Sequence, residues 1–285
     1  MAISIPDLEQ RAALGWRAPE EDRLGDWLLR AADGFTGRAN SALAVGDPGR
    51  PLDRAAPVVR DWYAARGLPA MIAVPYPADR PQAAPVSRFL AERGWSVRSG
   101  AVTVMTAPAR QIARIAGRVP DTPAGTRVGV DPQPDEAWLG LYHYRGQPGL
   151  PPVARQVLTS APWQAFASIR AAGHTVAIGR VAAAAGWAGL TAIEVTPEHR
   201  RRGLATVITA TLAARAAAYG AGHLYLQVED DNEAARALYR RLGFTAHHGY
   251  HYRVAPDGAD GTRLSGPSRA DAPGSDYWPR VRETS

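Results

Sequence analysis

The feature that most constrains this chain is a short basic segment between a strand-like run (residues 190–195) and a helix-like run (206–219). Its residues are Arg200, Arg201, Arg202, Gly203, Leu204 and Ala205. Small residues in such a turn let successive backbone N–H groups point at one spot, the positive end of the helix that follows. A diphosphate fits that spot, and Arg200 adds a fixed cationic fork.

The sequence downstream strengthens this interpretation. A strand is expected at 224–228, followed by the segment Glu-Asp-Asp-Asn at 229–232. A helix is then expected at 233–242, before Gly243 and Phe244. An Arg-x-x-Gly-x-Ala turn alone is weak evidence in a chain rich in arginine and glycine. The two segments together, in this order, indicate a binding site built on a strand–turn–helix–strand unit.

Composition narrows the function classes. The 285 residues suffice for one large domain or two ordinary ones. The absence of cysteine excludes disulfides, thiolate metal ligands and a cysteine acyl-enzyme, and it suits a reducing cytoplasm. The first residues lack the basic start and apolar core of a signal peptide, and no apolar run approaches the length of a membrane span. We therefore expect a cytoplasmic protein.

The net charge of +6 and the pI near 9.9 raise the question of nucleic-acid binding. All 33 cationic residues are arginine, and abundant Ala, Gly and Pro accompany them, as in the products of G+C-rich genomes. The arginines are dispersed except at 200–202. A solvated basic surface is favoured over a nucleic-acid partner.

Hydrophobic periodicity and turn residues predict alternating strands and helices throughout. In the first half we expect helices at 6–14, 52–66 and 86–93 and strands at 26–31, 39–45, 70–74 and 101–106. A short helical piece is expected at 110–116. In the second half we expect strands at 126–130, 165–170, 175–181, 189–195, 224–228 and 250–254, and helices at 135–144, 153–159, 206–219 and 233–242.

The two halves echo each other. Residues 93–96 (Arg-Gly-Trp-Ser) align with 242–245 (Leu-Gly-Phe-Thr), and the same register pairs Pro48 with Pro197. The first half, however, has Pro51-Leu52-Asp53-Arg54-Ala55-Ala56 where the second has its basic turn, and Leu90 where the second has Tyr239. A duplicated domain with one degenerate copy is predicted. Its parts are a degenerate domain (1–107), a linker (108–124), a catalytic domain (125–255) and a disordered tail (256–285).

The second half resembles the GNAT superfamily of N-acetyltransferases, which carry an Arg/Gln-x-x-Gly-x-Gly/Ala turn after a splayed central strand. Residues 195–205 match that pattern without a gap, and 232–244 resemble the family's second signature. The tandem layout is similar to mycothiol synthase and other actinobacterial double-GNAT proteins. The resemblance implies an α/β fold of two GNAT-like domains, each with a mixed, mostly antiparallel twisted sheet flanked by helices.

The resemblance also implies an acetyl-CoA-dependent N-acetyltransferase that acts on the amine of a small molecule or metabolite. The diphosphate of acetyl-CoA would bind the turn at 200–205, and its pantetheine arm would pair with the strand edge at Ile193 and Val195. Asn232 would hydrogen-bond the arm, and it is also a typical helix N-cap. Tyr239 would face the sulfur, although a lone tyrosine on an apolar stripe is more often core.

The base that accepts the amine proton stays open. Delivering a neutral alkyl amine at pH 7 costs about 4–5 kcal/mol, so a base is useful. Glu194 is the acid on the central strand, but strand alternation could equally turn it to solvent. His143, His247, His248 and His251 are alternatives, His248 being the histidine we select. No metal site is expected, because no carboxylate or cysteine in the sequence completes the cluster.

Two rival functions remain. A GNAT-like enzyme could take an aminoacyl group from charged tRNA, which the basic balance permits but an intact diphosphate turn argues against. Alternatively, the chain could be a non-catalytic acyl-CoA-binding regulatory module, against which Tyr239 weighs. The sequence leaves the acceptor amine and the oligomeric state open.

Overall fold

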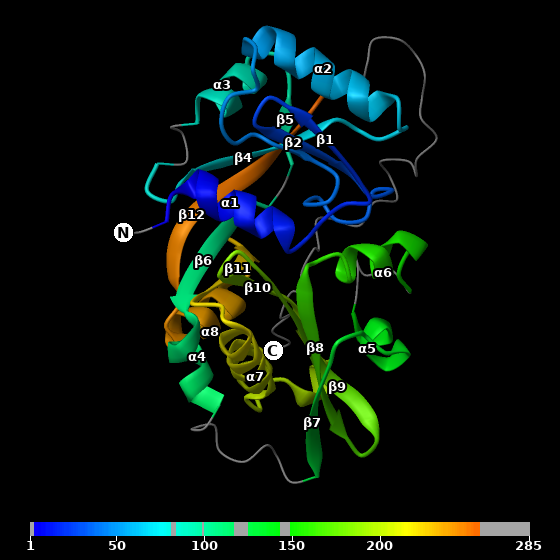
Figure 1. Cartoon of the computed structure of the whole chain (residues 1–285), viewed down its shortest axis with the longest axis vertical. Helices are drawn as coiled ribbons and strands as arrows, with labels where there is room; N and C mark the ends of the chain where they lie inside the picture. The colour runs from blue at the N-terminus through cyan, green and yellow to red at the C-terminus, as the bar shows by residue number, and fades with distance from the viewer. Residues whose placement is uncertain (1–2, 81–83, 99, 117–124, 143–148, 257–285) are drawn as a thin grey trace, which may run out of the picture.

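The computed structural model describes residues 3–80, 84–98, 100–116, 125–142 and 149–256. One large twisted sheet runs through the molecule, with helices on both of its faces (Figure 1). Among these residues no helix has the length and apolarity that a membrane crossing requires. His143, residues 117–124 of the expected linker and 257–285 of the expected tail lie outside the described residues.

The strands within the described ranges form a single sheet in the order β1-β2-β3-β4-β12-β6-β11-β10-β9-β8-β7, with β5 paired to β12. Their bounds are β1 (Glu20–Leu24), β2 (Trp27–Ala31), β3 (Ala42–Leu43), β4 (Met71–Pro77), β5 (Ser96–Val97), β6 (Val102–Pro108), β7 (Thr126–Asp131), β8 (Trp163–Ala171), β9 (His174–Ala184), β10 (Trp187–Val195), β11 (His223–Glu229) and β12 (Thr245–Val254). Most pairs are antiparallel; β3 with β4 and β10 with β11 are parallel.

The helices divide between the two faces of the sheet. They are α1 (Ile5–Leu14), α2 (Leu52–Ala64), α3 (Pro85–Ala91), α4 (Ala109–Ala116), α5 (Glu136–Leu141), α6 (Pro152–Leu158), α7 (Leu204–Tyr219) and α8 (Glu233–Leu242). In the second half, α4, α7 and α8 pack on one face around Leu226, Ile208 and Phe244. On the opposite face, α5 and α6 pack around Trp138 and Phe166, and α1 packs over Tyr225 and Tyr250.

Two strands interlock the halves. Strand β6, from the first half of the sequence, lies between β11 and β12 of the second. Strand β12 in turn pairs with β4 of the first half along Met71–Pro77. In Figure 1, β12 rises from the lower half into the upper one beside β6. The hydrogen bonding of the sheet is therefore continuous across the boundary expected at 107/108.

The internal repeat is visible in matching local geometry. The turn after helix α3 closes at Gly94 (φ +77°), and Trp95 N–H donates to the Leu90 carbonyl at 3.1 Å. Helix α8 ends in the same way at Gly243 (φ +98°), and Phe244 N–H donates to the Tyr239 carbonyl at 2.9 Å. These are C-terminal helix caps closed by a left-handed glycine.

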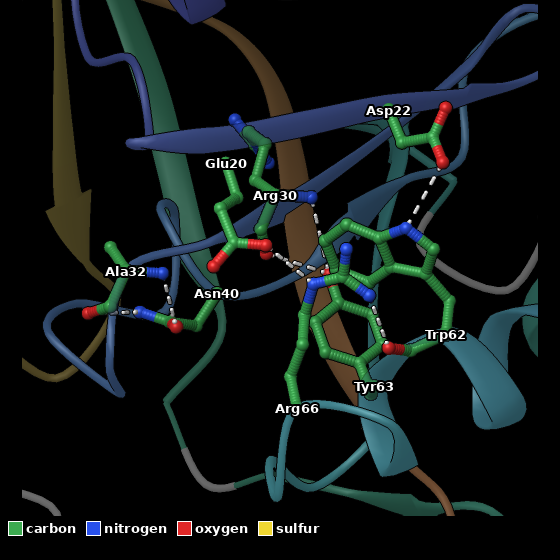
Figure 2. Close-up of polar contacts among 8 residues, drawn as sticks. All are labelled: Glu20, Asp22, Arg30, Ala32, Asn40, Trp62, Tyr63 and Arg66. Carbon is green, nitrogen blue, oxygen red and sulfur yellow. Dashed lines mark hydrogen bonds and ion pairs between the residues drawn. The ribbon is translucent and has the colours of Figure 1, made fainter.

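Polar contacts fasten the first half around its own helix α2 (Figure 2). The Tyr63 hydroxyl donates to the Arg30 carbonyl at 2.9 Å, and Trp62 Nε1 donates to Asp22 at 3.1 Å. Arg66 pairs with Glu20 at 2.9 Å. These bonds join α2 and the turn after it to the hairpin of β1 and β2, which carries Arg30.

Candidate active site

The central strands β10 and β11 separate halfway along their length. They pair in parallel from Trp187 with His223 to Leu190 with Leu226, and no pair is formed beyond that point. Strand β11 continues along β6 to Glu229, whereas β10 continues along β9 to Val195. The edge of β10 past Leu190 is therefore not paired with β11, and an extended ligand could pair there, as in strand addition.

A β-bulge turns the free end of β10. The register with β9 shifts between Thr191 and Glu194, and Ala192 has φ +53°, an uncommon value for a residue with a side chain. After the bulge, Ile193 and Val195 pack toward the α7 face. Both are half-buried, so the strand edge predicted to hold a pantetheine arm lies along the opening between the strands.

The turn that follows presents uncapped amides. Arg201 (φ +59°) and Gly203 (φ +78°) are both left-handed, and α7 begins after Gly203 without any side-chain cap. The first N–H groups of α7, including those of Leu204 and Ala205, point out of the helix end, which attracts an anion. A Cβ added at Gly203 would meet no protein atom within 4 Å. This local geometry suits a diphosphate.

The three arginines of the turn differ in their surroundings. Arg200 is half-buried, and its Nε donates to the Val195 carbonyl at 3.3 Å, which ties the turn to the end of β10. Arg201 and Arg202 are exposed. Arg200 thus orders the turn, while the other two contribute positive charge at its rim.

Asn232 and Tyr239 lie on the neighbouring helix α8. Asn232 caps the helix, since its Oδ1 accepts the Ala235 N–H at 3.0 Å. Tyr239 is 6% exposed, packs edge-on against Phe244 and belongs to the core between α7 and the sheet. Burial raises the pKa of Tyr239 above its ordinary value, so the hydroxyl stays protonated. The described residues offer this hydroxyl no hydrogen-bond partner, which leaves its proton available.

Glu194 turns inward rather than to solvent. It is 7% exposed and lies between Ile193 and Val195, so strand alternation directs it to the face opposite α7. Ala192 packs on that same face with Trp138 and Phe166. The acid of the central strand is therefore buried on the α5 side of the opening.

His248 is fully buried beneath α1 and uses both of its ring nitrogens. Its Nε2 lies 2.7 Å from Glu9 Oε1, and its Nδ1 lies 2.8 Å from His247 Nδ1. His247 Nε2 in turn lies 2.9 Å from the Ile3 carbonyl oxygen. The sheet register places His248 beside Val104 and, one strand further, Gln227, the first residue of β11 past its last pair with β10.

The carbonyl partner of His247 fixes one proton of this group. A carbonyl oxygen only accepts, so His247 Nε2 donates its proton to Ile3. The two remaining contacts join His247, His248 and Glu9 into one continuous run of side chains beneath α1.

The other histidines of the cluster do not all join this group. His251 Nε2 contacts Ser87 Oγ at 2.7 Å, toward α3. Burial and then Arg253 lower the pKa of His251. His251 thus belongs to the packing of the first half, whereas His247 and His248 belong to the space beneath α1.

The sequence analysis did not identify Glu9 as a candidate site residue, although the helical spacing of its apolar neighbours indicates that it is buried. On α1 it shares the buried face with Leu8, Ala12 and Ala13. An acid at helical spacing among apolar residues is a buried acid, which needs a partner. The sequence alone could not show that this partner is His248, which is 239 positions away.

The loop that leads into the corresponding turn of the first half carries aspartates. Asp26 accepts the Asp47 N–H at 2.8 Å, and Asp47 accepts the Gly49 N–H at 2.8 Å. Pro51 precedes α2, and Asp53 lies in its first turn. Aspartates already occupy amides of this loop, and their charges would repel a diphosphate.

Comparisons with known proteins agree with this geometry. Residues 3–253 match the family described as "Probable histone acetyltransferase Rv0428c C-terminal". The uncharacterized N-acetyltransferase YobR of Bacillus subtilis is 29% identical over 88% of this chain and 98% of its own length.

Two solved structures share the fold. A GCN5-related N-acetyltransferase from Kribbella flavida superposes with a TM-score of 0.64 at 21% identity, over 90% of this chain and 98% of that one. A tandem GNAT protein from the clavulanic acid biosynthesis pathway superposes with a TM-score of 0.62 at 17% identity, over 86% of this chain and 87% of that one.

The family match spans nearly the whole chain, and the α/β fold with its mostly antiparallel twisted sheet agrees with the prediction. The chain therefore belongs to the family of the Rv0428c C-terminal region and is a tandem N-acetyltransferase of the GNAT superfamily.

Proposed function

We propose that the second half transfers an acetyl group from acetyl-CoA to the amine of a small molecule or metabolite. The observation that carries this proposal is the separation of β10 from β11 directly before the uncapped N-terminus of α7. Acetyl-CoA has an extended arm with a diphosphate at one end. The arm would pair with the edge of β10, and the diphosphate would bind at the N-terminus of α7.

The donor would bind from the turn inward. The amides of Arg201, Arg202, Gly203, Leu204 and Ala205 would hold the diphosphate, with Arg200 fixing the turn. The arm would pair with the edge of β10 at Ile193 and Val195. The amide of Asn232 would contact the arm, because capping uses only its Oδ1.

The chemistry needs no nucleophilic side chain. The amine nitrogen attacks the thioester carbonyl, the N–C bond forms, and the C–S bond breaks. Tyr239 would donate its proton to the departing sulfur and regain one from the attacking nitrogen. Glu194 and His248, both buried on the other face of the sheet, are the proposed route for the ammonium proton.

A test is the release of free CoA from acetyl-CoA across a panel of amines. The panel includes small amines and a histone-tail peptide as the protein acceptor suggested by the family description. A separate reaction replaces acetyl-CoA with aminoacyl-tRNA as the donor and measures the transfer of its aminoacyl group. Small amines should be acetylated fastest. Preference for the peptide would mean that the acceptor is a protein rather than a small molecule. Transfer from aminoacyl-tRNA that depends steeply on salt would support aminoacyl-tRNA as the donor. Acetyl-CoA binding without any turnover would support a regulatory module.

A further inference from the structure

A small cavity lies beneath α1, where the two halves of the sheet meet. Its lining includes Glu9, Trp16, Arg30, Arg38, Gln227 and Tyr252. Gln227 is the first residue of β11 beyond its last pair with β10. The cavity is thus beside the opening between the strands, on the sheet face opposite Tyr239.

The cavity carries excess positive charge. The Arg38 guanidinium lies 4.4 Å from the centre of the Trp16 ring and has no hydrogen bond or ion pair within the described residues. Arg30 is 4% exposed, and its side chain donates to Ser41. Glu9 is the acid of the lining, one carboxylate against the two guanidinium groups of Arg30 and Arg38. Cations buried without counter-charges are unfavourable, so an anion would stabilise this cavity.

Two further buried donors lie on the same side of the opening. Arg180 is fully buried under Trp16, and its Nη1 has no partner among the described residues. Burial lowers the pKa of Arg180 to about 10, which keeps it charged at pH 7. Thr191 pairs directly with Arg180 across β9 and β10, and its buried Oγ1 is equally unpartnered within these ranges. Unsatisfied buried donors call for a polar ligand.

Arg38 is held in place by an ordered loop. Asn40 accepts the N–H groups of Ala32 and Gly34 at 2.9 and 3.0 Å, and its Nδ2 donates to the carbonyls of Phe35 and Thr36. Figure 2 shows Asn40 folded back onto Ala32. The loop backbone that carries Arg38 is therefore fixed, and its guanidinium rests on the Trp16 ring.

We propose that this cavity is the acceptor subsite and that the acceptor is an amine that also carries an oxyanion group, a carboxylate or a phosphate. This inference rests on the proposed function. Arg38, with Arg30 behind it, binds the oxyanion, and the amine is directed past Gln227 toward the opening. The cavity volume of about 20 Å³ holds roughly one water-sized group, so the cavity receives only the oxyanion end and the rest of the acceptor lies outside it.

In this arrangement the acceptor ammonium gives its proton to Glu9, which lies 2.7 Å from His248 of the proposed route and takes the place of Glu194. Glu9 returns that proton to solvent after the product leaves. The neutral amine then attacks, and the second N–H proton replaces the one that Tyr239 gives to sulfur. Protons and electrons balance without a further reactant.

The first experiment compares matched acceptor pairs that differ in the anionic group. The pairs are 4-aminobutanoate with 4-aminobutanamide, and O-phosphoethanolamine with ethanolamine; the two pairs distinguish carboxylate from phosphate. In the wild type, kcat/KM for one anionic member should exceed that of its neutral partner at least about tenfold, the value of a charged hydrogen bond. Arg38→Gln should reduce that preference to about twofold or less. Calorimetry with the same compounds measures binding apart from turnover.

The matched control is Arg66→Gln. Arg66 also lies over a tryptophan ring, 3.6 Å from the centre of Trp62, but outside the cavity. The Arg66→Gln variant should still prefer the anionic acceptor of each pair over the neutral one. The proposal is overturned if the neutral members bind and react as well as the anionic ones, or if Arg38→Gln keeps the preference. Failure of acetyl-CoA itself to bind would instead overturn the proposed function.

A second experiment tests Glu9 with Glu9→Gln, which can still hydrogen-bond His248. At pH 7, kcat should fall by about 10²-fold, and the deficit should shrink toward pH 10 as the amine loses its own proton. A purely structural role gives a deficit that does not change with pH and contradicts the proposal. Within the described part of the chain, the titratable and charged groups that face Glu9 are His248, Tyr250 and Tyr252 from β12, Tyr225 from β11, Arg30 from β2 and Arg38 from its loop.

Discussion

Gly203 determines whether the N-terminus of α7 can receive a diphosphate. Its φ of +78° is strained for any side chain, by about 1–2 kcal/mol. In Gly203→Val the new side chain meets no protein atom, so the fold should persist with a modestly lower Tm. It would project from the turn where the diphosphate must approach. We expect acetyl-CoA affinity to fall by at least about tenfold, measured by calorimetry.

Gly220→Val is the matched control for this variant. Gly220 is also left-handed (φ +105°), has no neighbour within 4 Å of an added Cβ, and ends the same helix α7. It should lower Tm to a similar degree and leave acetyl-CoA affinity unchanged. Equal affinities for the two variants would mean that the turn at 200–205 does not hold the diphosphate.

Tyr239 distinguishes a catalytic helix α8 from a purely structural one. Tyr239→Phe keeps the ring against Phe244 but removes the proton, so kcat should fall by about 10²-fold while Tm and acetyl-CoA affinity change little. Because burial raises the pKa above 10.0, Tyr239 stays protonated and should cause no alkaline decline of wild-type kcat below pH 10. Tyr63→Phe, in the core of the first half, is the control. Unchanged kcat with a chemistry-limited substrate would make Tyr239 a core residue only.

The sequence predicted residues that act locally and missed residues that act at a distance. The turn at 200–205 and Asn232 could be predicted because their roles depend on neighbours a few positions away. The direction of Glu194 could not, because the bulge at Ala192 changes the alternation along β10. The contacts of Glu9 and Arg38 depend on how α1 and the first half pack on the second.

At the scale of elements, the bulge in β10 is the feature with the clearest functional consequence. Ala192 tolerates φ +53°, but a β-branched side chain there would be strained by about 1–3 kcal/mol. Ala192→Val should lower Tm and weaken acetyl-CoA binding by straightening the strand edge at Ile193. Ala192→Gly relieves the strain and should preserve binding. A Val variant that binds like the wild type would show that the bulge does not shape the donor site.

The element predictions failed where tertiary context decides. Strand β1 was not expected, because its sequence Glu-Glu-Asp-Arg-Leu is mostly charged; it forms as an exposed edge paired with β2. Strand β12 begins at Thr245 rather than at the expected residue 250, because β6 and β4 supply partners for its first half. The strand expected at 39–45 shortens to Ala42–Leu43 since Asn40 holds the preceding loop.

At the scale of the whole molecule, the interlocked sheet predicts joint unfolding. Strand β6 buries Val104 and Met105 between strands of the second half, and β12 completes the sheet of the first. The full chain should therefore show one cooperative calorimetric transition, and saturating acetyl-CoA should shift all of it upward. Two transitions, with only the upper or lower one shifted by acetyl-CoA, would mean that residues 1–107 and 125–255 fold independently.

The central claim is that this tandem N-acetyltransferase has one working donor site, in its second half. Titration calorimetry of the full chain with acetyl-CoA tests it most directly. The predicted result is one site per chain, greatly weakened by Gly203→Val and retained by Gly220→Val, because Asp26 and Asp47 occupy amides of the first-half loop and would repel a diphosphate. Two sites of comparable affinity, or no binding at all, would contradict the account.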